Sequence, residues 1–302
     1  MDYPFDLPKI RIPYAAVYRL SLPTPSQEVE IMHGIGFNVR IVPGAVEVEH
    51  TVPVVQFGEG IVGTTIALQR IELPPATYAI VEIEVDPITH SAEPGTTTAA
   101  LRVAEVACVM ELLYRGIANQ KEFEGFVSSD SMYATSWEGP LELVALPHRP
   151  VEEIAGEIAQ ALAILEALKN EKRSRFRLAA RWFRRGCEAV NPVDKLLFWW
   201  TVLEVFPAQE TTDVPRSVVN FLHANVYPDV VPTQLKSAIG IGRIFGTRSR
   251  IVHDGLAFVS DLDFEFKAQL RQLRAIAATC LRLLCGLPAG DDLDLYVRLV
   301  DK

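Results

Sequence analysis

The sequence lacks the cysteine patterns that mark disulfide-rich or zinc-binding proteins. Its 302 residues hold four isolated cysteines and no Cys-x-x-Cys pair: Cys108, Cys187, Cys280 and Cys285. Thiols spread in this way are typical of a reducing compartment, where cysteine acts as a small core hydrophobe. The chain also lacks an apolar run that could span a bilayer, and Met1–Asp6 is too acidic for a signal peptide. We therefore expect a cytoplasmic protein that does not act at a membrane.

Motifs of several common enzyme classes are also missing. The chain contains no Walker sequence, no His-Glu-x-x-His and no Gly-x-Ser-x-Gly, and its histidines show no metal-ligand spacing. We expect no metal site and no cofactor. One glycine-rich run, Gly58–Gly63, fits the dinucleotide fingerprint, but β-branched residues follow it and Pro74 comes 11 residues later. A Rossmann helix does not fit in that space, so the run predicts a hairpin.

The net charge of −9 is unevenly distributed along the chain. Residues 1–150 carry nine basic and 19 acidic side chains, whereas residues 151–302 carry 20 and 19. An acidic half joined to a balanced half suggests two modules. Within the second half, Lys169–Arg185 holds eight basic residues and a single acid, Glu171. Such a basic face can attract nucleic-acid phosphate, although it is also typical of a solvated helix surface.

The N-terminal half reads as an α+β domain over residues 1–148. Alternating apolar residues predict strands, with proline and glycine between them, at Phe37–Val42, Ala45–Val52 and Tyr78–Val85. A helix over Thr98–Tyr114 is expected to cover this sheet, and Leu141–Leu146 is a candidate closing strand.

From Pro150 onward the hydrophobic period is helical, which predicts an all-α bundle over residues 149–302. A helix over Leu196–Phe206 is apolar nearly all round and should be buried, with Asn191-Pro192 as its start. The last long helix runs from about Asp261 to Leu284. Another predicted helix places one apolar stripe on its inner face: Ile154, Ile158, Leu162 and Leu165.

The run from Arg248 to His253 is the strongest chemical signal in the chain. Histidine exchanges a proton near neutral pH, and arginine holds phosphate with a planar fork of donors. The pair therefore suits cleavage of a phosphodiester, most plausibly in RNA. Arg248 and His253 are five residues apart, about 140° around an ideal helix, so they would not share a face. Either Arg248 sits at the helix entrance, or Arg250 is the true neighbour of His253.

Three ordered segments carry a resemblance to a known family. These are the aromatic and basic run Arg175–Phe183, the buried run Asp194–Glu204 and the motif segment Arg248–Gly255. Together they resemble the HEPN superfamily, and within it the Apea-like group, over roughly residues 150–286. One position departs from the pattern. The residue after the arginine is often Asn, Asp or His in active members, and here it is Ser249.

The resemblance implies a metal-independent endoribonuclease that acts as a homodimer, with a toxin-like or defensive role by family association. Arg248 and His253 would be catalytic, supported by residues near them: Ser249, Arg250, Asp254 and Glu204. The basic helix would supply the RNA-contacting residues: Arg175, Arg177, Arg181, Arg184 and Arg185. The acidic N-terminal half would bind a regulatory partner or act as a sensor.

A non-catalytic alternative remains open. Arg248 could instead pair with Glu204, a lone acid on an apolar helix, to hold two helices together. In that case the domain would be a non-catalytic module that dimerises and binds RNA, a nucleotide or a regulatory protein.

Overall fold

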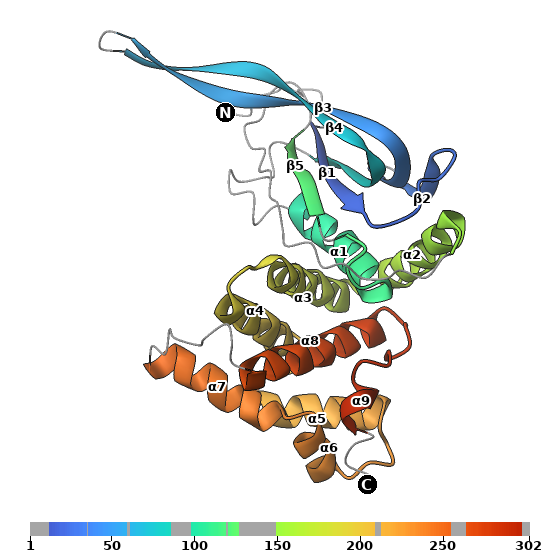
Figure 1. The fold of residues 1–302 in the computed structure, drawn as a ribbon, viewed down its shortest axis with the longest axis vertical. Coiled ribbons are helices and arrows are strands. Elements are labelled where there is room, and N and C mark those ends of the chain that lie inside the picture. The colour runs from blue at the N-terminus through green and yellow to red at the C-terminus, as the bar shows by residue number, and fades with distance from the viewer. Residues whose placement is uncertain are drawn as a thin grey trace, which may run out of the picture. The chain divides into compact units, whose positions relative to one another are not determined.

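The computed structural model describes residues 12–34, 36–58, 61–85, 98–118, 120–126, 149–208, 213–254 and 264–297. The strands are β1 (Ile12–Leu20), β2 (Val29–Gly34), β3 (Phe37–Gly58), β4 (Ile61–Val85) and β5 (Gln120–Phe126). The helices are α1 (Thr98–Leu113), α2 (Val151–Glu166), α3 (Asn170–Glu188), α4 (Pro192–Val205), α5 (Val214–Asn225), α6 (Pro232–Ala238), α7 (Ile241–Asp254), α8 (Phe264–Leu284) and α9 (Asp294–Val297). Figure 1 labels these elements. An antiparallel sheet is followed by a helical region, as the sequence predicts.

The five strands form one antiparallel sheet in the order β2-β3-β4-β1-β5. The strands expected from alternating residues lie within β3 and β4, so the sequence prediction of strands is confirmed there. One face buries a continuous row that includes Ala16, Val39 and Val81. The opposite face carries a second apolar cluster around Val17, Tyr78 and Phe123. The candidate closing strand at residues 141–146 lies outside the described residues.

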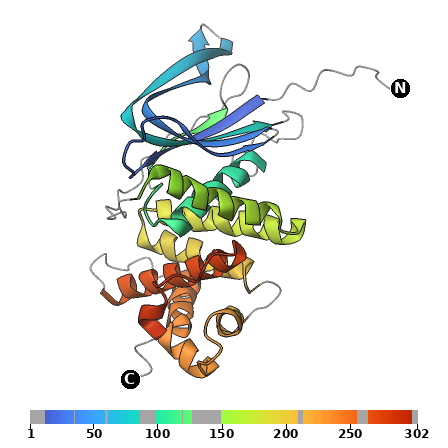
Figure 2. The same ribbon diagram turned by 90° about the vertical axis from the view of Figure 1, so that its right-hand side faces the viewer.

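β3 and β4 pair over almost their whole length and form a long two-stranded ribbon (Figure 1). The pairing continues to Gly58 and Ile61, which lie opposite each other. The glycine-rich run therefore joins two strands of a hairpin, as predicted, and does not begin a Rossmann helix. Figure 2 shows the far part of this ribbon bending away from the rest of the sheet.

The chain divides into two compact units, and neither is a continuous stretch of sequence. The first comprises residues 1–103 and 116–159, and the second comprises residues 104–115 and 160–302. This division differs from a single boundary near Pro150. Helix α1 was expected to cover the sheet. Its first residues belong to the sheet unit, where the Arg102 guanidinium carbon lies 4.1 Å from the centroid of the Phe37 ring, and its residues 104–113 belong to the helical unit.

Within the helical unit, α3 and α4 approach closely at Gly186. A Cβ atom at this position would lie 2.9 Å from Cε2 of Trp199, so only glycine fits the contact. The Trp199 indole also donates a hydrogen bond of 3.2 Å to the carbonyl of Phe183. Asn191 caps α4 by accepting a hydrogen bond of 2.8 Å from the Val193 amide, and Pro192 occupies the first turn. The predicted start of this buried helix is confirmed.

Two acids of α1 lie inside the helical unit and pair with arginines. Glu105 is fully buried, and its carboxylate lies 2.9 Å from Nε of Arg177 and 3.5 Å from Nε of Arg173. Glu111 lies 2.5 Å from Arg274 of α8 and 3.8 Å from Arg184 of α3. The second half of α1 is therefore an internal part of the helical unit. Among the described residues, no helix is both long and apolar enough to cross a membrane.

Candidate functional site

Helix α7 carries the whole candidate motif. Arg248 is the eighth residue of this 14-residue helix, so it does not lie at the helix entrance. Ile241, Ile244 and Thr247 are buried and form the inner face. On the resulting α7 surface, Arg250 and His253 are both exposed and lie one turn apart. Arg250, and not Arg248, is therefore the cation on the same side of α7 as His253.

Arg248 is held at the edge of the buried face by Glu204 of α4. Its Nη2 atom lies 3.1 Å from Oε1 of Glu204, and the same oxygen accepts a hydrogen bond of 2.8 Å from Nε1 of Trp200. The partner expected for Glu204 is therefore present. The two side chains remain 25% and 38% exposed, so solvent still reaches the ion pair. This arrangement fixes the position of the Arg248 guanidinium.

The Nε atom of Arg248 is buried and has no hydrogen-bond partner among the described residues. The fork of Arg248 is thus only partly used by Glu204. The N–H groups of Arg248 that do not bond to Glu204 can donate to an acceptor outside the protein when the side chain moves and exposes them.

The edge of α7 next to Arg248 is apolar and exposed. Phe245 and Val252 are 40% and 46% exposed, and they lie one turn before and one turn after Arg248 and Ser249. The ring of Phe245 is 5.7 Å from the ring of Trp200, which anchors this edge on α4. Ser249 is half-buried. The side chain of Asp254, the last residue of α7, lies outside the described residues.

The five candidate RNA-contacting arginines lie on α3 and differ in their surroundings. Arg184 is buried at 3% exposure and pairs with Glu111 and Glu188, so it cannot reach a phosphate. Arg177 pairs with the buried Glu105, and Arg175 pairs with Glu171 at 2.6 Å. Arg181 is half-buried, whereas Arg185 is exposed. Some arginines of the basic run therefore form ion pairs within the protein, whereas Arg185 faces solvent.

Sequence reasoning gave no role to two aromatic residues of the quoted runs, Trp182 and Phe198, the first of which contacts Arg185. Trp182 of α3 and Phe198 of α4 are both half-buried, and their ring centroids lie 5.7 Å apart. The signal was available, because a tryptophan within a run of arginines is unusual for a merely solvated helix face.

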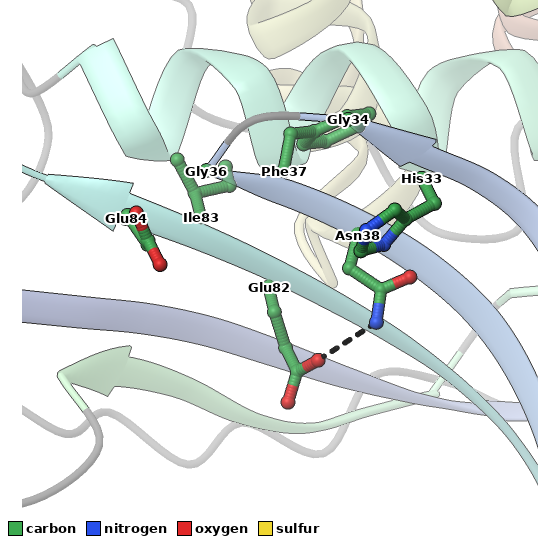
Figure 3. Close-up of a pocket in the computed structure, with 8 residues that line it drawn as sticks. All are labelled: His33, Gly34, Gly36, Phe37, Asn38, Glu82, Ile83 and Glu84. Carbon is green, nitrogen blue, oxygen red and sulfur yellow. Dashed lines mark hydrogen bonds between the residues drawn. The ribbon is translucent and has the colours of Figure 1, made fainter.

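The sheet unit has a separate hollow of about 440 Å³ where β2, β3 and β4 lie side by side (Figure 3). His33, Asn38 and Glu82 occupy neighbouring positions across the three strands. Asn38 donates a hydrogen bond of 3.2 Å to Glu82, which also lies 3.3 Å from Arg40. The Glu82 carboxylate is thus already engaged, and we assign no ligand to this hollow.

Among the described residues, no three His, Cys, Asp or Glu side chains gather as metal ligands would. Comparison of the chain with protein-family models, with curated proteins and with solved structures gives no match.

Proposed function

We propose that the protein is a HEPN-type endoribonuclease of the Apea-like group, which acts as a homodimer through the α7 surface. One observation carries the proposal: His253 is exposed one turn from Arg250, on the same helix whose Arg248 is held in place by Glu204. A proton-transfer group, an exposed cation and an anchored guanidinium thus come from a single helix.

The reaction requires two proton transfers around one phosphorus atom. The RNA 2′-oxygen forms a bond to phosphorus as the bond from phosphorus to the 5′-oxygen breaks. One histidine accepts the proton of the 2′-hydroxyl, and a second histidine donates a proton to the departing 5′-oxygen. The products are a 2′,3′-cyclic phosphate and a 5′-hydroxyl. Since each chain offers one His253, two copies would supply both roles, and an arginine would stabilise the phosphorane charge.

The apolar edge of α7 favours assembly of two copies. A surface that pairs with its own copy about a two-fold axis must be self-complementary, and exposed apolar side chains meet that requirement. Phe245 and Val252 would lie in this contact. We expect light scattering to give twice the 33.5 kDa chain mass at micromolar concentration. A Phe245→Glu/Val252→Glu variant should shift the mass towards that of a monomer.

A second function is favoured by the ion pair itself. Since Glu204 already engages Arg248, this arginine could serve only to join α4 and α7. The protein would then be a non-catalytic module that dimerises and binds RNA, a nucleotide or a regulatory protein. In both cases we propose a cytoplasmic protein whose sheet unit binds a regulatory partner.

The deciding experiment incubates purified protein with total RNA, with and without a chelator. We expect cleavage that the chelator does not change and that His253→Ala removes. His33→Ala is the matched control, because His33 is also exposed but lies in the sheet unit. Undiminished cleavage by His253→Ala would overturn the catalytic assignment. RNA binding without cleavage by the wild-type protein would favour the binding module.

A further inference from the structure

The outer surface of α3 carries a layered arrangement of side chains that the motif on α7 does not use. Leu178, Trp182 and Arg185 follow one stripe at spacings of four and three residues, and Leu178 is 40% exposed. The Arg185 guanidinium carbon lies 5.2 Å from the centroid of the Trp182 ring. Trp182 packs on Phe198 of α4 at an angle of 31° between the rings. The half-buried indole of Trp182 therefore contacts both the exposed Arg185 guanidinium and the half-buried Phe198 ring.

Arg185 differs from other arginines of α3 in whether a carboxylate balances its charge. Arg175, Arg177 and Arg184 have carboxylate partners. Arg185 has none within the described part of the chain, and its guanidinium lies over the Trp182 ring. The α3 stripe thus ends in a cation that has an aromatic surface beneath it. A guanidinium on a ring keeps its donors directed outward, where a phosphate can accept from them.

The same surface continues along α4 towards the candidate motif. On α4 the buried side chains, which include Leu196, Trp199 and Leu203, define the inner face. Phe198 and Glu204 are half-buried and border the opposite face, on which Thr201 lies between them. Since Phe198 packs on α3 and Glu204 pairs with Arg248 of α7, this face of α4 joins the aromatic stack to α7.

We infer that Trp182, Arg185 and Phe198 form a stacking site for an unpaired base of single-stranded RNA. This inference rests on the proposed ribonuclease function and names its substrate class. An unpaired base can stack on an exposed aromatic or guanidinium plane, whereas bases within an A-form duplex already stack on each other. The phosphate next to the stacked base would accept from Arg185. The strand would then follow the half-buried face of α4 that carries Thr201, towards Arg248 of α7.

The test measures binding of fluorescent RNA by anisotropy, with the full-length His253→Ala protein so that cleavage does not intervene. The probes are an unstructured 12-nucleotide strand and a duplex of the same strand. We expect the single strand to bind at least tenfold more tightly than the duplex. Trp182→Leu should weaken binding of the single strand by roughly 5- to 100-fold, the range for loss of one stacked base. Arg185→Ala should make the salt dependence shallower by about 0.7 in the log–log slope.

Two further variants keep the interpretation clear. Arg185→Glu changes an exposed side chain, so it tests the site even if Trp182→Leu does not fold. Arg271→Ala is the matched control, because Arg271 is an exposed arginine of α8 and not of α3, and it should bind RNA as the parent does. The stacking site is overturned if the single strand and the duplex bind equally, or if Trp182→Leu and Arg185→Glu bind as tightly as the parent.

The stacking site and the ribonuclease function fail in different experiments. Cleavage by the wild-type protein, together with unaltered binding by the α3 variants, overturns the stacking site alone. Single-strand binding that depends on Trp182 and Arg185, without cleavage by the wild-type protein, supports the stacking site and overturns the nuclease. Absence of any RNA affinity overturns the stacking site, and the cleavage assay then decides the nuclease separately.

Discussion

Arg248 of α7 and Glu204 of α4 form an ion pair in which a guanidinium nitrogen lies 3.1 Å from a carboxylate oxygen. The pair joins two helices and also fixes the cation that the proposed reaction would use. Under the proposed function, one arginine would combine a role in stability with a role in catalysis. Substitutions of Arg248 and Arg250 should affect these two roles differently.

We expect Arg250→Ala to lower cleavage while leaving the thermal midpoint unchanged, because Arg250 is exposed and lies one turn from His253. Arg248→Ala should lower both, since it also leaves Glu204 without its cation. Arg248→Lys should restore stability better than cleavage, because an ammonium lacks the planar fork. The measurements are kcat on a fluorescent RNA and thermal unfolding of each variant.

The loss of cleavage in His253→Ala is the reference with which the two arginine variants are compared. Loss of a general acid or base lowers the rate by about 10²- to 10⁴-fold. If Arg248→Ala lowers only the thermal midpoint and Arg250→Ala changes neither quantity, the two arginines have no part in cleavage.

The buried acids of α1 give a second prediction. Glu111→Gln should destabilise the protein by about 3–5 kcal/mol, because it leaves the buried Arg184 and Arg274 without their shared carboxylate. The control is Glu171→Gln, which breaks a surface pair with Arg175 and should cost less than about 1 kcal/mol. Urea unfolding measures both. Equal midpoints for the two variants would show that the buried pairs do not stabilise the fold.

A fragment of residues 150–302 should not fold stably by itself. It contains α3 and α8 but lacks Glu105 and Glu111, so four arginines would lose carboxylates that are buried in the full chain: Arg173, Arg177, Arg184 and Arg274. A fragment that starts at Thr98 restores these acids and should give a cooperative thermal transition. Circular dichroism of the two fragments, with heating, compares them directly. A cooperative transition from the shorter fragment would contradict the internal role of α1.

The close approach at Gly186 predicts a large effect from one added methyl group. Gly186→Ala places a carbon against the Trp199 ring and should cost about 1–3 kcal/mol. Gly156→Ala in α2 is the control, because a Cβ there meets nothing within 4 Å. That control should be neutral or stabilise by up to about 1 kcal/mol, since alanine favours helices. The thermal unfolding midpoints of Gly186→Ala and Gly156→Ala test this prediction.

The half-buried Cys187 and the buried Cys280 predict a loss of stability at alkaline pH. Burial raises the pKa of Cys187 from its ordinary value of 9.0 to about 11, and Glu111 adds to the rise. Burial also raises the pKa of Cys280. A thiol with a raised pKa stays protonated in the folded state, so its contribution is complete below pH 9 and is lost as the unfolded chain ionises above it. We expect a loss on the order of 2 kcal/mol per thiol between pH 9 and 11. In urea unfolding measured across this pH range, Cys280→Ala should make the decline of the unfolding free energy with pH less steep. An unchanged decline would show that ionisation of this thiol does not cause it.

Local patterns in the sequence predicted the strands within β3 and β4 and several of the long helices, but not β1, β2 or β5. Alternation in Tyr78–Val85, the turn at Gly58 and the cap at Asn191 each depend on residues close together in the chain. The division of α1 between two units could not be predicted in this way. It depends on Glu111 meeting Arg274, a partner 163 residues away that no local pattern indicates.

In the candidate site, too, local spacing was predictable from the sequence and tertiary contacts were not. Helical spacing alone suggested that Arg250 would neighbour His253, and α7 has this geometry. The exclusion of Arg184 from the surface was not predictable from the basic run, because charge composition does not tell which side of a helix faces inward. The stacking of Trp182 on Phe198 requires the packing of α3 on α4, which is likewise a tertiary feature.

The acids of α1 also set an order of events during protein synthesis. Glu105 and Glu111 leave the ribosome well before α3, and Arg274 follows Glu111 only after another 163 residues. Glu105 can pair once α3 has been made, whereas Glu111 lacks its Arg274 partner until α8 follows, and an unpaired charge is costly to bury. The helical unit can therefore complete its interior only after α8 has been made. A chain that stops before α8 would expose acids and apolar faces together, which makes it a ready substrate for proteolysis.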